Sequence, residues 1–178
     1  MSTFLIITAV LLAIAIAVAL VAASAKPDTF RVRRAAVIAA SPETIFPLIA
    51  EFHQWAGWSP WEHRDPAMKR IFEGPQRGVG AVYAWDGNRN VGAGRMEIVE
   101  ATTPSKIVIK LDFIKPFEGH NIAEFALQPK GPSTEIVWTM HGPAPFLSKI
   151  MQLVMNMDKM IGKDFEAGLA GLKRLAEA

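Results

Sequence analysis

The polar residues best placed to contact a small molecule are one tyrosine and one asparagine, each set among apolar neighbours. Tyr83 is the only tyrosine in the chain, and its phenol joins an apolar ring to a hydroxyl that can orient a ligand carbonyl. Asn121 falls in the same strand alternation as Phe125 and Leu127, so its amide would offer a second polar contact. The alternative is that both are ordinary polar residues of a packed interior.

The other chemistry-bearing residue types form no recognisable catalytic or metal-binding set. The chain has no cysteine, which excludes disulfides, thiol nucleophiles and cysteine-type zinc sites. Its four histidines include no i, i+4 pair and no HExxH motif. Glu62, His63 and Asp65 suggest an acid–base cluster, but a solvated turn before Pro66 is the simpler interpretation. We therefore expect no catalytic residue, no cofactor and no metal.

Most candidate ligand contacts are apolar side chains that face inward from strands and from the tail of the chain. The candidate ligand-cavity residues are Tyr83, Trp85, Met96, Ile98, Ile109, Leu111, Phe113, Asn121, Phe125, Trp138, Met140, Leu153, Met157, Met160 and Ile161. Segment 151–160 contains four methionines, and methionine is an adaptable side chain common at permissive apolar sites. Plain core packing is the alternative interpretation for each of these residues.

Two kinds of hydrophobic spacing divide the chain after residue 26 into strands and helices. Alternating apolar residues predict strands at 29–39, 68–73, 79–85, 91–101, 106–114, 118–127 and 134–141. Ser41 is a good N-cap, and Pro42 suits the first turn of a helix that Pro47 keeps short or bent. Apolar residues spaced by three or four from Phe146 to Leu175 predict one long amphipathic helix.

The order of these elements predicts an α+β fold. Most links between strands are short, so about seven strands should form one curved antiparallel sheet. The long C-terminal helix is the obvious cover for its apolar face. Three tryptophans lie within residues 55–61, between glycine and proline, and this segment is predicted to be an ordered loop or short helical turn packed on the core.

Residues 3–25 carry no charged side chain and are almost wholly aliphatic. About 20 such residues cross a hydrocarbon core of roughly 30 Å, so we predict a transmembrane helix at 3–25 and one soluble domain at 26–178. The stretch is longer than the roughly 7–15 apolar residues of a secretory signal peptide, and no Lys or Arg precedes it. A retained single-pass anchor is therefore favoured, although Ala23-Ser24-Ala25 also fits a cleavage site.

Positive charge flanks this segment only on its C-terminal side, at Lys26, Arg31, Arg33 and Arg34. The positive-inside rule then predicts a cytoplasmic soluble domain. The alternative is a periplasmic domain, or one secreted after cleavage near Ala25. A net charge of +2 and the lack of longer basic runs give no reason to expect nucleic acid as a partner.

Several short segments occur in an order typical of a known superfamily. They are Ser41-Pro42-Glu43-Thr44-Ile45-Phe46, Trp55 with Trp58-Ser59-Pro60-Trp61, Gly78-Val79-Gly80, Gly92-Ala93-Gly94-Arg95-Met96-Glu97-Ile98 and Thr134-Glu135-Ile136-Val137-Trp138-Thr139-Met140. By these segments and their order, residues 30–178 resemble the START-like superfamily, also called SRPBCC, in its polyketide cyclase/dehydrase branch. The resemblance implies the helix-grip fold, with a deep apolar cavity between the sheet and the long helix.

The resemblance implies a class of ligand and leaves the activity open. Members bind lipids, sterols, polyketides, quinones or plant hormones, and a minority catalyse cyclisation, so the fold does not fix the function.

Our first hypothesis is a membrane-anchored domain that binds a small apolar molecule. The second is a cyclase/dehydrase-type enzyme, which would need acid–base groups converging in the pocket; few polar residues fall on the inner faces. The third is a chaperone-like interaction domain without a ligand. The oligomeric state is left open.

Overall fold

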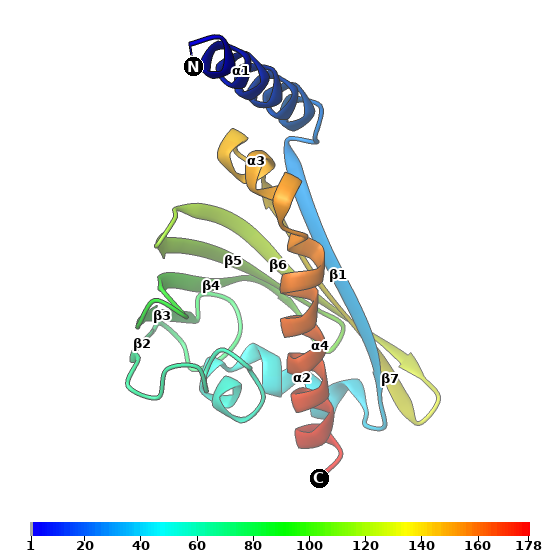
Figure 1. The fold of residues 1–178 in the computed structure, drawn as a ribbon. Helices are drawn as coiled ribbons and strands as arrows, with labels where there is room; N and C mark the ends of the chain where they lie inside the picture. Colours follow the sequence, from blue (N-terminus) through cyan, green and yellow to red (C-terminus); the bar gives the residue numbers. More distant parts are fainter. Residues whose placement is uncertain (1) are drawn as a thin grey trace.

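The computed structural model describes residues 2–178, which form one sheet and its covering helices after a separate N-terminal helix (Figure 1). The helices are α1 (Ser2–Ser24), α2 (Pro42–Ala50), the 3-10 helix η1 (Phe52–Gly57), α3 (Phe146–Val154) and α4 (Met157–Ala176). The strands are β1 (Thr29–Ile38), β2 (Lys69–Glu73), β3 (Val82–Asp86), β4 (Ala93–Thr102), β5 (Lys106–Lys115), β6 (Gly119–Lys130) and β7 (Ser133–Pro143).

The seven strands form one antiparallel sheet in the order β1-β7-β6-β5-β4-β3-β2. Consecutive strands from β2 to β7 are neighbours, and β1 joins the far side by pairing Thr29 with Pro143. Residues opposite one another on neighbouring strands share a face, so Tyr83, Met96, Leu111 and Asn121 make one rung of the inner face. The predicted α+β helix-grip fold with a curved antiparallel sheet is confirmed.

The segment between β1 and β2 supplies helix α2 and the tryptophans that pack beneath the sheet. Ser41 caps α2 by accepting a hydrogen bond from the Thr44 N–H at 3.3 Å. The buried indole N–H groups of Trp55 and Trp58 donate to the carbonyl oxygens of Ile49 and Leu48 at 3.0 and 2.9 Å. These bonds use carbonyls near the end of α2, so the tryptophan-rich segment is fixed to that helix.

The tail of the chain is two helices, and the prediction of one continuous helix over 146–175 is wrong. Helix α3 ends at Val154, Met155 is extended, and α4 begins at Met157. The reason is local: the Asn156 side chain accepts a hydrogen bond from the Lys159 N–H at 2.9 Å, which is an N-cap. The apolar spacing continues across this cap, so spacing alone does not reveal it.

Helix α4 covers the inner face of the sheet and buries Phe165, Leu169 and Leu172. Arg34 of β1 fixes its first turns: its Nε donates to Glu166 at 2.7 Å, and its Nη2 donates to the Asp158 carboxylate and backbone carbonyl at 3.1 and 3.0 Å. These hydrogen bonds hold the pKa of the Asp158 carboxyl below its ordinary value. Gly162 faces the Arg34 guanidinium, and a β-carbon there would collide with it.

Helix α1 is long and apolar enough to cross a membrane. Almost all of its described side chains are exposed, and only Ala19 and Ala23 are covered to any degree. These two residues share a helix face, and α3 packs against α1 in the structure (Figure 1). By length, composition and position, α1 fits either an anchor or a signal sequence.

Candidate functional site

Aromatic rings fill the space between the sheet and the C-terminal half of α4. Trp138 of β7 stacks on Phe165 of α4 with ring centroids 4.0 Å apart and planes 5° apart. Phe125 of β6 stacks on the same indole at 4.7 Å, and Trp58 meets it edge-on at 5.7 Å. This part of the interior is a tightly packed aromatic cluster.

One polar atom inside this cluster has no partner. Among residues 2–178, the Trp138 Nε1–H is the one fully buried side-chain nitrogen or oxygen without a hydrogen bond. An unmet buried donor destabilises a fold by about 1–3 kcal/mol, and tryptophan N–H groups normally find a partner when buried. The Trp138 N–H is therefore an unused hydrogen-bond donor inside the packed cluster.

The structure brings the predicted strand residues together on the inner face. Met96, Ile98, Ile109, Leu111, Asn121, Phe125, Trp138, Met140 and Tyr83 are all buried there. Trp85 and Phe113 are half-buried at one end of the face, with ring centroids 6.0 Å apart. Their role as ligand contacts stays a prediction, because core packing alone accounts for the same burial.

The predicted helix residues lie differently. Leu153 and Met160 are 38% and 46% exposed, and Met157 is half-buried. Ile161 packs against the core from the first turns of α4. These four residues flank the break between α3 and α4, so only Ile161 faces the same interior as the strand residues.

A buried polar cluster was missed by reasoning from the sequence. The Tyr83 hydroxyl donates to Glu62 Oε1 at 2.5 Å, and Arg70 Nε donates to Glu62 Oε2 at 2.7 Å. The expected solvated turn is wrong for Glu62 and for Asp65, which are both buried. Asp65 accepts the Asn88 N–H at 2.7 Å. No local pattern marks this cluster, because its members come from separate elements.

Tyr83 is protected from ionisation, and this gives a titration that can be followed directly. Burial first, and then the hydrogen bond to Glu62, raise the pKa of Tyr83 well above its ordinary value of 10.0. The folded protein therefore keeps this proton after the unfolded chain has lost it. The stabilisation is complete below about pH 10 and falls by about 1.4 kcal/mol per pH unit above that, until the folded pKa is reached.

Because Tyr83 is the only tyrosine, the tyrosinate absorbance band reports this one group. We expect the folded protein to show almost no band at about pH 11 and the urea-unfolded protein to show the full band. Tyr83→Phe should lack both the band and this alkaline loss of stability. A band that appears at about pH 10 in the folded protein would contradict the buried hydrogen bond.

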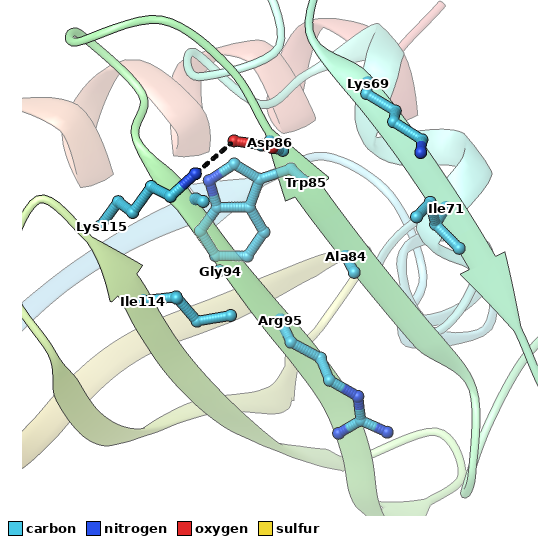
Figure 2. A pocket seen from close by; sticks show the side chains of 10 residues that line it. Lys69, Ile71, Ala84, Trp85, Asp86, Gly94, Arg95, Ile114 and Lys115 are labelled. Atoms are coloured by element: carbon cyan, nitrogen blue, oxygen red, sulfur yellow. Dashed lines mark ion pairs between the residues drawn. The ribbon is translucent and has the colours of Figure 1, made fainter.

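Two hollows lie at the β2–β3 edge of the sheet, and neither lies between the sheet and α4. The first, of about 270 Å³, has Ile71, Ala84 and Ile114 in its wall, with the Trp85 indole beside Gly94 (Figure 2). Lys115 and Asp86 pair across its rim at 3.5 Å. The second, of about 300 Å³, is lined by His53 and Phe72, whose rings stack at 3.9 Å. Both are open grooves rather than enclosed cavities.

Within the described part of the chain, no group of three histidine, aspartate or glutamate side chains is arranged to hold a metal ion. The buried polar groups beside the predicted ligand contacts include Tyr83 with Glu62, the Asn121 amide and the Trp138 N–H. Each can hold or donate one hydrogen bond in an apolar setting. This is the composition of a site that orients a mostly apolar molecule by a few contacts.

Solved structures share this fold at low sequence identity. Protein CV1439 from Chromobacterium violaceum matches with a TM-score of 0.59 and 16% identity, over 86% of this chain and 99% of that one. The di-domain ARO/CYC BexL from the BE-7585A biosynthetic pathway matches at 0.60 and 16%, over 88% of this chain and 53% of that one. The Aha1 dimer from Colwellia psychrerythraea matches at 0.58 and 16%, over 83% and 96%.

No functionally curated protein matches the sequence. The sequence profile of a family described as polyketide cyclase/dehydrase and lipid transport matches residues 29–177, from the first strand to the end of α4. The match covers the whole sheet, the aromatic cluster and the polar groups beside it. The chain therefore belongs to the polyketide cyclase/dehydrase and lipid transport family.

Proposed function

We propose that this protein binds a small apolar molecule with one hydrogen-bond acceptor, between the inner face of the sheet and helices α3 and α4. The observation that carries the proposal is the buried Trp138 N–H without a partner. Because the rings around Trp138 are packed and the two hollows lie at the β2–β3 edge, binding here requires the cluster to open. A ligand carbonyl would then satisfy this donor, and the Phe125 and Phe165 rings would offer apolar contact. The family description, which includes lipid transport, supports this class of ligand.

The end of the inner face nearest α3 is where we place ligand entry. Asn121 is buried there and lies against Gly142, two residues before Ala144 and the start of the α3 segment. The break at Met155–Asn156 lets α3 move without unwinding α4, because the Asn156 cap already ends that helix. We therefore propose that a ligand reaches the inner face beside Leu111 and Asn121, at the sheet end from which the α3 segment starts.

The test compares the molecule retained by wild type and by Trp138→Phe. Full-length protein is purified from membranes of its own host and examined by native mass spectrometry with lipid extraction. Phenylalanine keeps an aromatic ring beside Phe165 and removes only the N–H and part of the indole. We expect the affinity for the ligand to fall about tenfold in Trp138→Phe. This change corresponds to one lost hydrogen bond of about 1.4 kcal/mol.

Trp61→Phe is the matched control, because Trp61 meets the same cluster edge-on at 5.8 Å and is only half-buried. It should retain the ligand like wild type. Equal retention by Trp138→Phe would contradict the assigned role of the N–H. A clean apo mass, with no uptake of quinones, sterols or fatty acids, would instead favour the interaction-domain hypothesis.

A cyclase-type enzyme is the second candidate, and one observation favours it. Glu62, Tyr83 and Arg70 are titratable groups that converge at the inner face, which is the arrangement that acid–base chemistry requires. However, both carboxylate oxygens of Glu62 already accept hydrogen bonds from the protein. A substrate would have to displace one of them, so binding without turnover remains our first proposal. If wild type converts a poly-β-ketone thioester and Tyr83→Phe does not, the enzyme becomes the first proposal and binding without turnover the second.

We also propose that α1 is a retained anchor and that the domain at 26–178 faces the cytoplasm. The flanking Lys26, Arg31, Arg33 and Arg34 support this orientation through the positive-inside rule. Protease treatment of right-side-out and inverted membrane vesicles tests it. Digestion only in inverted vesicles supports the proposal, whereas a mature N-terminus after Ala25 would show a cleaved signal.

A further inference from the structure

We propose that α3 and the β5–β6 turn form a second membrane contact, on the same bilayer that α1 spans. This inference rests on the proposed anchor and adds a surface of the folded domain that lies in the membrane interface. The occupant is the lipid surface itself. The argument combines the topology of one sheet end, the bonds that fix α3 there, and the apolar side chains exposed at that end.

The linker from α1 and the segment that leads to α3 both join the sheet at the same end. Thr29, the first residue of β1, pairs with Pro143, the last residue of β7. The linker between α1 and β1 is residues 25–28, which span at most about 14 Å when fully extended. The beginning of α3 therefore cannot lie far from the membrane surface when α1 is inserted.

Two hydrogen bonds tie the α3 segment to this linker. The Ala144 N–H donates to the Asp28 carbonyl at 2.7 Å, and Lys149 Nζ lies 2.6 Å from the Asp28 carboxylate. Lys149 is buried although α3 is otherwise open to solvent on one side, so the pair orients the helix. The hydrogen bond from Lys149 also lowers the pKa of the Asp28 carboxyl. The opposite face of α3 is left outward.

Helix α3 also contacts α1 itself. Ala23 of α1 is fully buried and Ala19 is partly covered, and α3 is the element that packs against α1. The small alanine side chains allow a close approach between the two helices. Figure 1 shows α3 beside α1. If α1 spans the bilayer, a helix that touches its last turns and is bonded to its linker would lie at the bilayer surface.

Large apolar side chains are exposed to solvent, wholly or in part, at this end. They are Phe146, Leu147, Leu153, Val154 and Met155 from α3 and the break, Ile114 from the end of β5, and Phe117 from the β5–β6 turn. Val154 is 84% exposed and Phe117 is 64% exposed. The turn belongs to the same end because β5 and β7 run in parallel through β6.

Scattered exposed apolar residues are normal on soluble proteins, but a cluster at one end marks an interaction surface. An amphipathic helix next to a membrane lies in the interface plane with its apolar face about 5–10 Å into the headgroup and acyl boundary. The apolar face of α3 fits this arrangement. The contact would also place the proposed ligand entry beside the lipid phase.

The experiment uses single-cysteine variants of the full-length chain, which has no native cysteine. Val154→Cys and Phe117→Cys carry an environment-sensitive fluorophore, and the protein is reconstituted in phosphatidylcholine–phosphatidylglycerol vesicles with spin-labelled lipids. Val99→Cys is the matched control, because Val99 is 45% exposed on β4 and lies towards the opposite end of the sheet. Leu12→Cys reports whether α1 is inserted.

We expect strong quenching at Leu12, quenching at Val154 and Phe117 that places them about 5–10 Å inside the interface, and none at Val99. If Leu12 is quenched but Val154 and Phe117 are as unquenched as Val99, the inference of a second membrane contact is overturned and the proposed anchor stands. An unquenched Leu12 would overturn the anchor and this inference together. If instead a fluorophore at Val154 reports an apolar environment that depends on the protein density in the vesicles and not on the spin-labelled lipid, the surface belongs to a second copy of the chain. That result would overturn the inference of a membrane contact.

Discussion

Phe165→Ala is expected to lower the free energy of unfolding of the soluble part by about 3–5 kcal/mol. Phe165 is 2% exposed and stacks on Trp138 with centroids 4.0 Å apart. Its removal loses the apolar transfer energy of the ring and leaves a cavity that the rigid neighbours Trp58, Trp61 and Trp138 cannot fill. The measurement is urea unfolding of the full-length protein in detergent, followed by tryptophan fluorescence.

Phe117→Ala is the matched control for this prediction, because it deletes the same side chain from an exposed turn. In detergent we expect it to change the free energy of unfolding by no more than about 0.5 kcal/mol. If Phe165→Ala were equally mild, the aromatic cluster would be loosely packed. Uptake of a small aromatic molecule by Phe165→Ala, with recovery of stability, would further show that the interior accepts an apolar guest.

Glu62→Ala is expected to lower the free energy of unfolding by about 2–4 kcal/mol. Its carboxylate accepts the Tyr83 hydroxyl at 2.5 Å and the Arg70 guanidinium at 2.7 Å. The variant leaves a buried hydroxyl without a partner and a partly buried cation without its counter-charge. The cost is limited because the Arg70 side chain is still partly open to solvent. Urea unfolding in the same detergent measures it.

The control is Glu97→Ala, which breaks a 2.7 Å pair with Arg95 whose two side chains are both partly open to solvent. Exposed pairs contribute about 0–1 kcal/mol, so this variant should stay close to wild type. The titration of Tyr83 gives a second readout: without Glu62, tyrosinate should form at lower pH than in wild type, because the acceptor that holds the hydroxyl proton is gone. Equal losses in both variants would show that Glu62 is not effectively buried.

The strands and the single antiparallel sheet could be predicted because alternation along a strand records which side chains are buried. Ile107, Ile109 and Leu111 alternate with Lys110 and Asp112, and the former are buried in the structure. The same reasoning identified α1, whose uniform apolar composition needs no tertiary context. The family resemblance, which covers residues 30–178, agreed with the sheet, and the profile match over residues 29–177 confirmed it.

The helix break shows where this reasoning fails although the information is local. Asn156 is a good N-cap residue, yet apolar residues continue at helical spacing on both sides of it. Apolar residues spaced by three or four positions predict a helix that continues through such a cap. A broken helix and a continuous helix can bury the same row of apolar side chains. The break separates the outward-facing α3 from the core helix α4.

What the sequence by itself determined is therefore the strands with their buried faces, the short helix after Ser41 and the apolar N-terminal helix. These follow from side-chain periodicity, capping residues and uniform apolar composition along the chain. Only the tertiary structure decided which polar groups meet. Glu62 and Tyr83 are 21 residues apart, and Arg34 and Asp158 are 124 apart. Such pairs depend on strand register and helix placement, which no local pattern encodes. The unpartnered Trp138 N–H is likewise defined only by what surrounds it in space.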